Sequence, residues 1–97
     1  MQIHEKMKAM RMAEGLSQSK FSEMLEISIS TVKKYDGGFA EPGSAVLMKI
    51  LQHPRFIKYT LWMMTGQTAP ESGQIAPALA HSGQESAESS QSEKKIG

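Results

Sequence analysis

Apolar side chains recur at helical spacing along the first two thirds of the chain, with charged and polar residues between them. Ile3, Met7 and Met10 repeat at i, i+4 and i+7, which predicts an amphipathic first helix with these side chains facing the core. Gly15 follows this pattern and is expected to end the helix. The folded part of the chain is therefore expected to begin with a short helix.

Capping residues predict a second and a third helix separated by a tight turn. Ser17 and Ser28 both fit N-cap positions, so the second helix is expected to run through Leu25 and the third to about Asp36. The stretch LEISISTVKKY, residues 25–35, also alternates like a β-strand, but the chain offers no second strand to pair with it. We therefore interpret it as the end of one helix, a turn and the start of the next.

Two more helices complete the expected domain. Pro42 and Ser44 mark the start of a fourth helix, and Pro54 occupies a first-turn position for a fifth helix over residues 55–65. The sequence thus predicts an all-α fold, a compact bundle of five short helices, in residues 1–66.

The predicted fifth helix carries two apolar stripes, one through Phe56 and Met63 and the other through residues 57, 61 and 64. A surface helix of a small domain needs only one apolar stripe. We therefore expect the second stripe to form a symmetric homodimer interface made of Ile57, Leu61, Met64 and Trp62. The alternative is that both stripes are buried within one subunit.

Residues 67–97 differ in composition from the helical region. They are rich in Ser, Gln, Glu, Ala, Gly and Pro and contain no aromatic residue. Such a segment buries too little apolar surface to offset its ordering entropy, which predicts a disordered C-terminal tail. We expect an inert, solvated tail, and the alternative is a tether or a segment that binds a protein partner.

Length and composition exclude several protein classes. The chain has 97 residues, of which 39% are apolar, and this suits one small domain. It has no cysteine, which excludes disulfides, zinc–thiolate sites and thiol catalysis. No apolar run approaches the roughly 20 residues that cross a bilayer, and the charged N-terminus differs from a signal peptide. A cytoplasmic protein without a membrane partner is expected.

The formal net charge of +1 is unevenly distributed. Residues 1–66 hold nine Lys or Arg against six Asp or Glu, whereas residues 67–97 hold two Lys against four Glu. The first region is mildly basic and the second mildly acidic, which slightly favours a polyanionic partner.

No motif for catalysis or cofactor binding is present in the sequence. His4, His53 and His81 lie in different segments without the spacing of metal ligands. No Ser–His–acid grouping, glycine-rich phosphate loop or pair of carboxylates stands out. We expect no enzymatic activity, no metal and no cofactor.

The third predicted helix has a polar face that could read a ligand. Counted at 100° per residue from Ile29, Val32 and Tyr35 point to one side, while Ser30 and Lys34 point nearly opposite. A short helix, a tight turn and a second helix with an exposed polar face are the parts of a helix-turn-helix DNA reader.

The stretch LSQSKFSEMLEISISTVKKYDGG resembles the helix-turn-helix of the Cro and phage-repressor family, also called XRE-like. The family pattern of Gly-Leu-Ser-Gln, an apolar–small pair, Ser-x-x-Thr-apolar and aromatic–acid–x–Gly matches residues 15–18, 21–22, 28–32 and 35–38. The resemblance covers residues 3–66. It implies a lambda-repressor-like DNA-binding domain, with a double-stranded DNA operator as its partner. It also implies a phage or prophage repressor-like transcriptional regulator that reads a palindromic site as a dimer and lies on the nucleoid when bound.

The resemblance also implies roles for individual residues. Gln18 begins the first motif helix, where the family contacts a phosphate and braces the reading side chains. Family members reach base edges from the positions of Ile29, Ser30, Thr31 and Lys34. Contacts near phosphate are expected from Lys20, Ser28 and Lys33.

Other positions bear on structure or on a second function. Arg11 and Asp36 match two family positions that pair across the domain, and two separate solvated charges are the alternative. Glu26 stands where the family often has glycine, so the turn is expected either to be strained by a positive φ at a non-glycine residue or to have a different shape. Ile29, Phe39 and the low net charge favour the alternative function, a protein-interaction module of antitoxin or anti-repressor type on the same fold.

Overall fold

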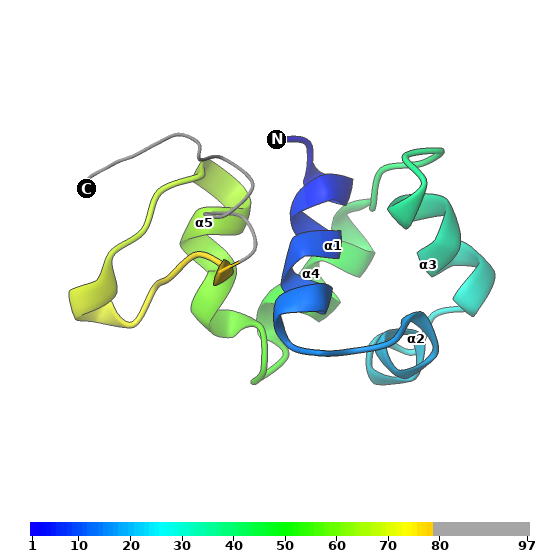
Figure 1. Ribbon diagram of the computed structural model, residues 1–97, viewed down its shortest axis with the longest axis horizontal. Helices are drawn as coiled ribbons and strands as arrows, with labels where there is room; N and C mark the ends of the chain where they lie inside the picture. Colours follow the sequence, from blue (N-terminus) through cyan, green and yellow to red (C-terminus); the bar gives the residue numbers. More distant parts are fainter. Residues whose placement is uncertain (79–97) are drawn as a thin grey trace.

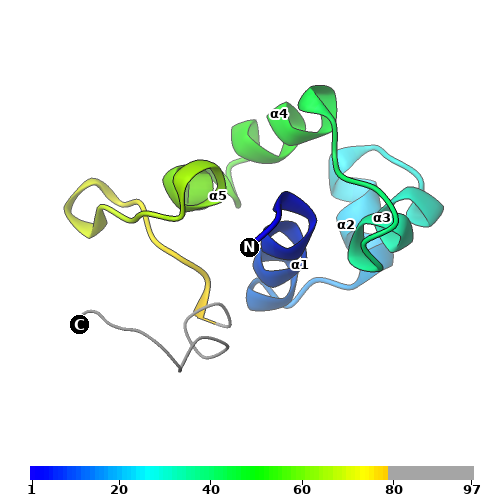
Figure 2. The ribbon, with the colours of Figure 1, turned by 90° about the horizontal axis from the view of Figure 1, so that it is seen from above.

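The computed structural model describes residues 1–78, and five α-helices account for most of their regular structure. They are α1 (Ile3–Ala13), α2 (Gln18–Leu25), α3 (Ile29–Asp36), α4 (Ser44–Gln52) and α5 (Thr60–Thr65), with 3-10 segments η1 (Ile57–Tyr59) and η2 (Pro70–Ser72). Helix α1 lies in the middle, with α2 and α3 on one side and α5 on the other (Figures 1 and 2). The predicted all-α bundle of five short helices is confirmed.

Side-chain caps begin α2 and α3 where the sequence predicts them. The Ser17 hydroxyl accepts a hydrogen bond from the Lys20 amide at 3.0 Å, and the Ser28 hydroxyl accepts one from the Thr31 amide at 3.1 Å. Each cap satisfies a backbone N–H that has no partner inside its helix, which stabilises the helix by about 1 kcal/mol. Two local caps therefore fix where both motif helices start.

The turn between α2 and α3 contains a strained residue. Glu26 adopts the left-handed conformation, with φ 58° and ψ 45°. Its amide donates to the Glu23 carbonyl, and the next amide, that of Ile27, donates to the Ser22 carbonyl at 3.1 Å, so α2 closes in the manner usual for a C-terminal glycine. Of the two expected outcomes, the structure shows the strained turn with a positive φ at a non-glycine residue, at a cost of about 1 kcal/mol, and not a turn of different shape.

The hydrophobic core joins all five helices around α1. Met7 and Met10 of α1 are fully buried, and Phe21 of α2 meets Phe56 edge-on, with ring centroids 5.5 Å apart. The other buried apolar residues of this cluster are Leu16, Leu25, Val32, Tyr35, Ile50, Tyr59, Trp62 and Met63. Burial of these residues fixes α3 against the rest of the domain.

The fifth helix starts later than the predicted residues 55–65. The His53 carbonyl accepts hydrogen bonds from the Phe56 amide at 2.9 Å and the Ile57 amide at 3.0 Å. The His53 ring accepts a third from the Arg55 amide at 3.1 Å. These bonds hold Pro54 in a non-helical turn, whereas the prediction placed it in the first turn of the fifth helix. The α-helix therefore begins only at Thr60.

Residues 67–78 form an ordered segment that folds back against η1 and α5, in place of the predicted disorder. Ala69 and Gln74 exchange backbone hydrogen bonds at 2.8 and 3.1 Å, and the Gln74 side chain bonds both the Leu61 amide and the Ile57 carbonyl. The Ile75 amide donates to the Lys58 carbonyl at 2.9 Å, and Pro77 is fully buried. The prediction of disorder is wrong for this segment because Gln74 satisfies backbone groups at η1 and α5.

The remainder of the predicted tail, residues 79–97, lies outside the described residues. Within residues 1–78, no helix combines the length and the apolar character needed to cross a bilayer.

Candidate nucleic-acid interface

Helix α3 presents a polar and basic face to solvent. Ser30, Lys33 and Lys34 are exposed, whereas Val32 is fully buried and Tyr35 is 7% exposed. The exposure agrees with the predicted orientation of the helix. It leaves two ammonium groups and a hydroxyl on the outer side of a helix whose inner side is fixed in the core.

A hydroxyl network covers the first turn of α3. The Ser28 Oγ that caps the helix also lies 2.7 Å from Thr31 Oγ1 and 3.1 Å from Ser30 Oγ. A hydroxyl has one proton and two lone pairs, so three partners use the full capacity of Ser28. We therefore assign Ser28 to positioning the helix start, while Ser30 and Thr31 retain hydrogen-bonding capacity for a ligand.

Arg11 and Asp36 form an ion pair that ties α1 to the last residue of α3. Arg11 Nη2 donates to Asp36 Oδ2 at 2.8 Å, and the two side chains are only 11% and 8% exposed. Arg11 Nη1 also donates to the Leu16 carbonyl at 2.8 Å. The predicted pairing is confirmed, and the alternative of two separate solvated charges is wrong.

Gln18 reinforces the same junction from the start of α2. Its Nε2 donates to Asp36 Oδ2 at 2.7 Å, so the side chain joins the N-terminus of one motif helix to the C-terminus of the other. The bond braces the end of α3, the helix that carries the predicted reading side chains, and the bracing of those side chains themselves stays a prediction. The phosphate contact of Gln18 stays a prediction.

Lys20 and Lys49 lie near the motif, on α2 and α4. The side chain of Lys20 is 61% exposed, and its Nζ lies 3.9 Å from Glu23 Oε1, a loose surface pair. Lys49 Nζ lies 3.5 Å from the Glu26 carbonyl and so contacts the strained turn, a contact that the sequence did not indicate. Lys20 therefore remains available for an anionic ligand.

The predicted dimer residues separate into two groups. Ile57 and Met64 are each 53% exposed, and Leu61 is half-buried. Residues 1–78 therefore leave Ile57 and Met64 of this stripe exposed, and both the homodimer and the alternative of burial within one subunit stay predictions. Trp62 is only 5% exposed and packs beneath Lys6, whose Nζ lies 5.5 Å from the ring centroid, so we remove Trp62 from the predicted interface.

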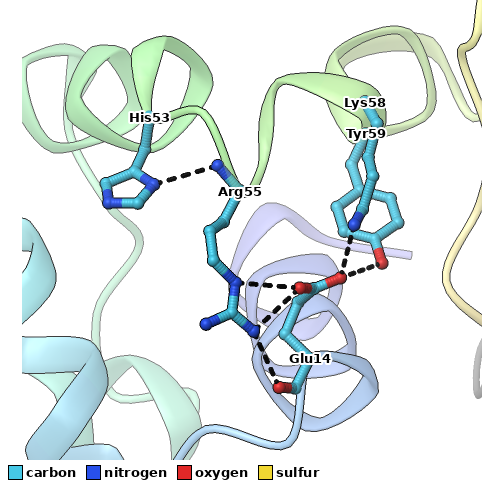
Figure 3. Close-up of polar contacts among 5 residues, drawn as sticks. All are labelled: Glu14, His53, Arg55, Lys58 and Tyr59. Carbon is cyan, nitrogen blue, oxygen red and sulfur yellow. Dashed lines mark hydrogen bonds and ion pairs between the residues drawn. The ribbon is translucent and has the colours of Figure 1, made fainter.

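A carboxylate cluster that the sequence did not reveal lies between the C-terminal end of α1 and η1 (Figure 3). Glu14 Oε1 accepts from Arg55 Nε at 3.2 Å and from Arg55 Nη2 at 3.0 Å. Glu14 Oε2 accepts from Tyr59 Oη at 2.7 Å and lies 2.9 Å from Lys58 Nζ. The four residues connect the end of α1 to η1. The charged groups of Arg55 and Lys58 pair with the Glu14 carboxylate and are also partly exposed to solvent.

This cluster shifts the pKa of two groups. Burial raises the pKa of Glu14, but hydrogen bonds from Lys58, Tyr59 and Arg55 outweigh it and lower the pKa to about 2. Burial, together with the hydrogen bond to Glu14, raises the pKa of Tyr59 to about 12. Sequence reasoning missed the cluster because Glu14 is 41 residues from Arg55 and no local motif links them.

A second long-range contact fixes the loop that follows α3. The His4 amide donates to Glu41 Oε1 at 2.9 Å, and the His4 ring pairs with the other carboxylate oxygen. This hydrogen bond to the ring is the main cause that lowers the pKa of Glu41. Within residues 1–78, no group of three potential metal ligands comes together.

Comparison with known proteins identifies a relative that matches almost the whole chain. No model of a known protein family matches the sequence. The chain is 47% identical over 95 residues to "Repressor protein C" of Escherichia phage P2, and the match covers 98% of this chain and 96% of that protein.

Proposed function

Because the chain belongs to the family of repressor protein C of Escherichia phage P2, we propose that it is a repressor-like transcriptional regulator that binds double-stranded DNA by sequence. The observation that carries the proposal is the outer face of α3, where Ser30, Lys33 and Lys34 are exposed on a helix held by a buried ion pair. We further propose that residues 15–38 are a helix-turn-helix of XRE type. It lies in a DNA-binding domain predicted over residues 1–66, against which the ordered residues 67–78 pack.

Lysine ammonium groups would supply the phosphate contacts. Lys20, Lys33 and Lys34 are exposed on α2 and α3, and with respect to residues 1–78 none of them lies in a close ion pair. Arg55 and Lys58 differ because both face the Glu14 carboxylate at about 3 Å. Binding through phosphate neutralisation weakens steeply with salt, so affinity should fall by orders of magnitude between about 50 and 200 mM salt.

Sequence reading would come from the side chains of Ile29, Ser30, Thr31 and Lys34. Lysine donates to the O6 and N7 acceptors of guanine, and a hydroxyl donates or accepts at several base edges. The Arg11–Asp36 pair and the Gln18 bond hold α3 in one orientation, which preorganises this face for the major groove. The Gln18 phosphate contact belongs to the same proposal.

The reading unit would be a symmetric dimer. Ile57, Leu61 and Met64 make up the predicted apolar stripe on η1 and α5, and α5 lies on the opposite side of α1 from α2 and α3 (Figure 2). Two-fold pairing places the two α3 helices in half-sites about 34 Å apart, and the operator is then palindromic. Regulation would follow from occupancy, with the bound dimer blocking or positioning RNA polymerase.

Selection from a pool of random duplex DNA, followed by sequencing, tests the proposal. Wild type and Lys34→Ala would be compared at about 50 and 200 mM salt. Enrichment of a palindrome by wild type, lost or altered in the variant, is the expected result. Lys58→Ala removes the same charge outside the motif and should keep the wild-type palindrome. Failure of folded wild type to enrich any sequence would overturn the proposal.

A second candidate function is supported by Phe39. This side chain is 85% exposed in the loop after α3, where the resemblance places a phosphate-contacting basic residue. An exposed aromatic side chain suits a protein partner, as in an antitoxin or an anti-repressor. Under this alternative, Phe39→Ala abolishes co-purification of the partner and Lys34→Ala changes little.

A further inference from the structure

Ile29 is an apolar side chain at the exposed start of the proposed recognition helix. It is the first residue of α3 and is 41% exposed, although Val32 and Tyr35 of the same helix are buried. Its helical neighbour one turn later is Lys33, which is also exposed. Ile29 therefore lies on the flank of the outer face and contributes less to the core than these two residues.

The hydroxyls around Ile29 discriminate poorly between bases. Ser28 is saturated by its cap and by its two hydroxyl neighbours. Ser30 and Thr31 can each donate or accept, so each can satisfy several base edges. Discrimination in the first turn of α3 consequently falls to its one exposed apolar side chain, that of Ile29, because Val32 is buried.

We propose that Ile29 is a specificity-determining residue that packs against the C5-methyl group of a thymine in each operator half-site. The inference rests on the proposed DNA-binding function and adds to it the identity of one base. In the major groove thymine presents an apolar methyl group, whereas adenine and cytosine present amino groups that donate hydrogen bonds. An amino group against Ile29 loses its water without gaining an acceptor, so both bases are disfavoured.

The position of this thymine relative to a second contact follows from helix geometry. Ile29 and Lys34 are five residues apart, which corresponds to about 7.5 Å along the axis of α3. Base pairs are spaced by about 3.4 Å along the duplex. The thymine should therefore lie within about three base pairs of the guanine that Lys34 contacts.

Uracil substitution isolates the methyl contact. Uracil pairs like thymine and lacks only the C5-methyl group, so each thymine of the selected operator is replaced in turn. Binding of wild type, Ile29→Ala and Lys34→Ala to each duplex is measured at about 50 mM salt, where phosphate contacts keep weak complexes measurable. Ile29 is partly exposed, and circular dichroism would establish that Ile29→Ala retains the wild-type fold.

The expected result is a penalty at one thymine of each half-site. Loss of one buried methyl weakens wild-type binding about fourfold for each substituted half-site and about 15-fold for both. Ile29→Ala shows no penalty at that position, while Lys34→Ala binds more weakly and keeps the penalty. Ile29→Val, which removes a single methylene, should show an intermediate penalty.

Two different failures are distinguishable. If wild type selects a palindrome but tolerates uracil everywhere, or if Ile29→Ala keeps the penalty, the assignment of Ile29 is overturned and the DNA-binding function stands. If wild type selects no sequence at all, the proposed function fails and this inference fails with it.

Discussion

Arg11 Nη2 and Asp36 Oδ2 lie 2.8 Å apart in a nearly buried ion pair that connects α1 to the end of α3. Two further atoms of this pair, Arg11 Nε and Asp36 Oδ1, are buried without a hydrogen-bond partner. A buried pair of this kind adds little net stability compared with apolar residues, but losing one member leaves the other charged and unpaired. The pair therefore acts chiefly as a constraint on the position of α3.

Asp36→Ala should destabilise the protein by about 3 kcal/mol, because it leaves the Arg11 guanidinium buried without its partner. The measurement is urea denaturation followed by circular dichroism. The double variant Arg11→Met with Asp36→Leu removes both charges and should recover most of the loss. A destabilisation of Asp36→Ala below about 1 kcal/mol would show that the pair is effectively solvated.

Glu26 is a position where a substitution should stabilise the protein. A residue with a Cβ is strained at φ 58°, whereas glycine adopts this conformation freely. Glu26→Gly should exceed Glu26→Ala in unfolding free energy by about 1 kcal/mol, since both variants lack the carboxylate and only alanine keeps the Cβ. Urea denaturation of the two variants gives this difference directly. Equal stabilities would contradict the left-handed turn.

The Glu14 cluster should make stability depend on pH in acid. The pKa of Glu14 is lowered from its ordinary value of 4.5 to about 2 in the folded protein, so folding favours the ionised carboxylate. This contribution is fully present above pH 4.5 and is lost as the pH falls towards 2. The test is the urea midpoint of wild type and Glu14→Gln between neutral pH and pH 2.

Glu14→Gln should be less stable than wild type at neutral pH, because it loses the ion pairs with Arg55 and Lys58. The difference in stability between wild type and Glu14→Gln should become smaller as the pH falls, because protonation of Glu14 removes its ion pairs from wild type as well. A gap that stays constant down to the folded pKa of about 2 would mean that Glu14 titrates normally.

The apolar stripe on η1 and α5 should control self-association. Met64→Glu places a charge on a side chain that is 53% exposed, so it should leave the fold intact and prevent pairing with a second copy. Analytical ultracentrifugation should show a wild-type dimer and a monomeric variant, and the variant should bind a single half-site weakly.

Met12→Glu is the matched control for the dimer, since Met12 is 50% exposed on α1 and outside the stripe. It should sediment as wild type does. A wild-type protein that stays monomeric well above micromolar concentration would exclude the dimer, whatever the variants show.

The parts of the fold that could be predicted from the sequence depend on local chemistry. Ser17 and Ser28 cap helices through amides three residues away, and alternation of buried and exposed residues orients α3 through its own periodicity. The resemblance to the Cro and phage-repressor family added the pairing of Arg11 with Asp36, which periodicity alone does not indicate. The orientation of the candidate DNA-reading face was therefore predictable from the sequence.

The missed features depend on residues far apart in the chain. Glu14 meets Arg55 across 41 positions, and no spacing rule connects a carboxylate with a guanidinium at that distance. Gln74 contributed to the compositional signal for disorder, yet its side chain bonds backbone groups of Ile57 and Leu61. A prediction from composition assumes that a glutamine side chain is solvated. Only the tertiary structure shows that the Gln74 amide takes the place of water as the hydrogen-bond partner of backbone groups near the start of α5.

The return of residues 67–78 also determines where the protein can be divided. A fragment that ends at Gly66 loses the Gln74 side chain, so the Leu61 amide and the Ile57 carbonyl lose their partners. It also uncovers the core surface against which Ala76 packs and the site that buries Pro77. A fragment for biophysical work or for fusion with a reporter domain should therefore retain at least Pro77, eleven residues beyond the glycine that ends α5.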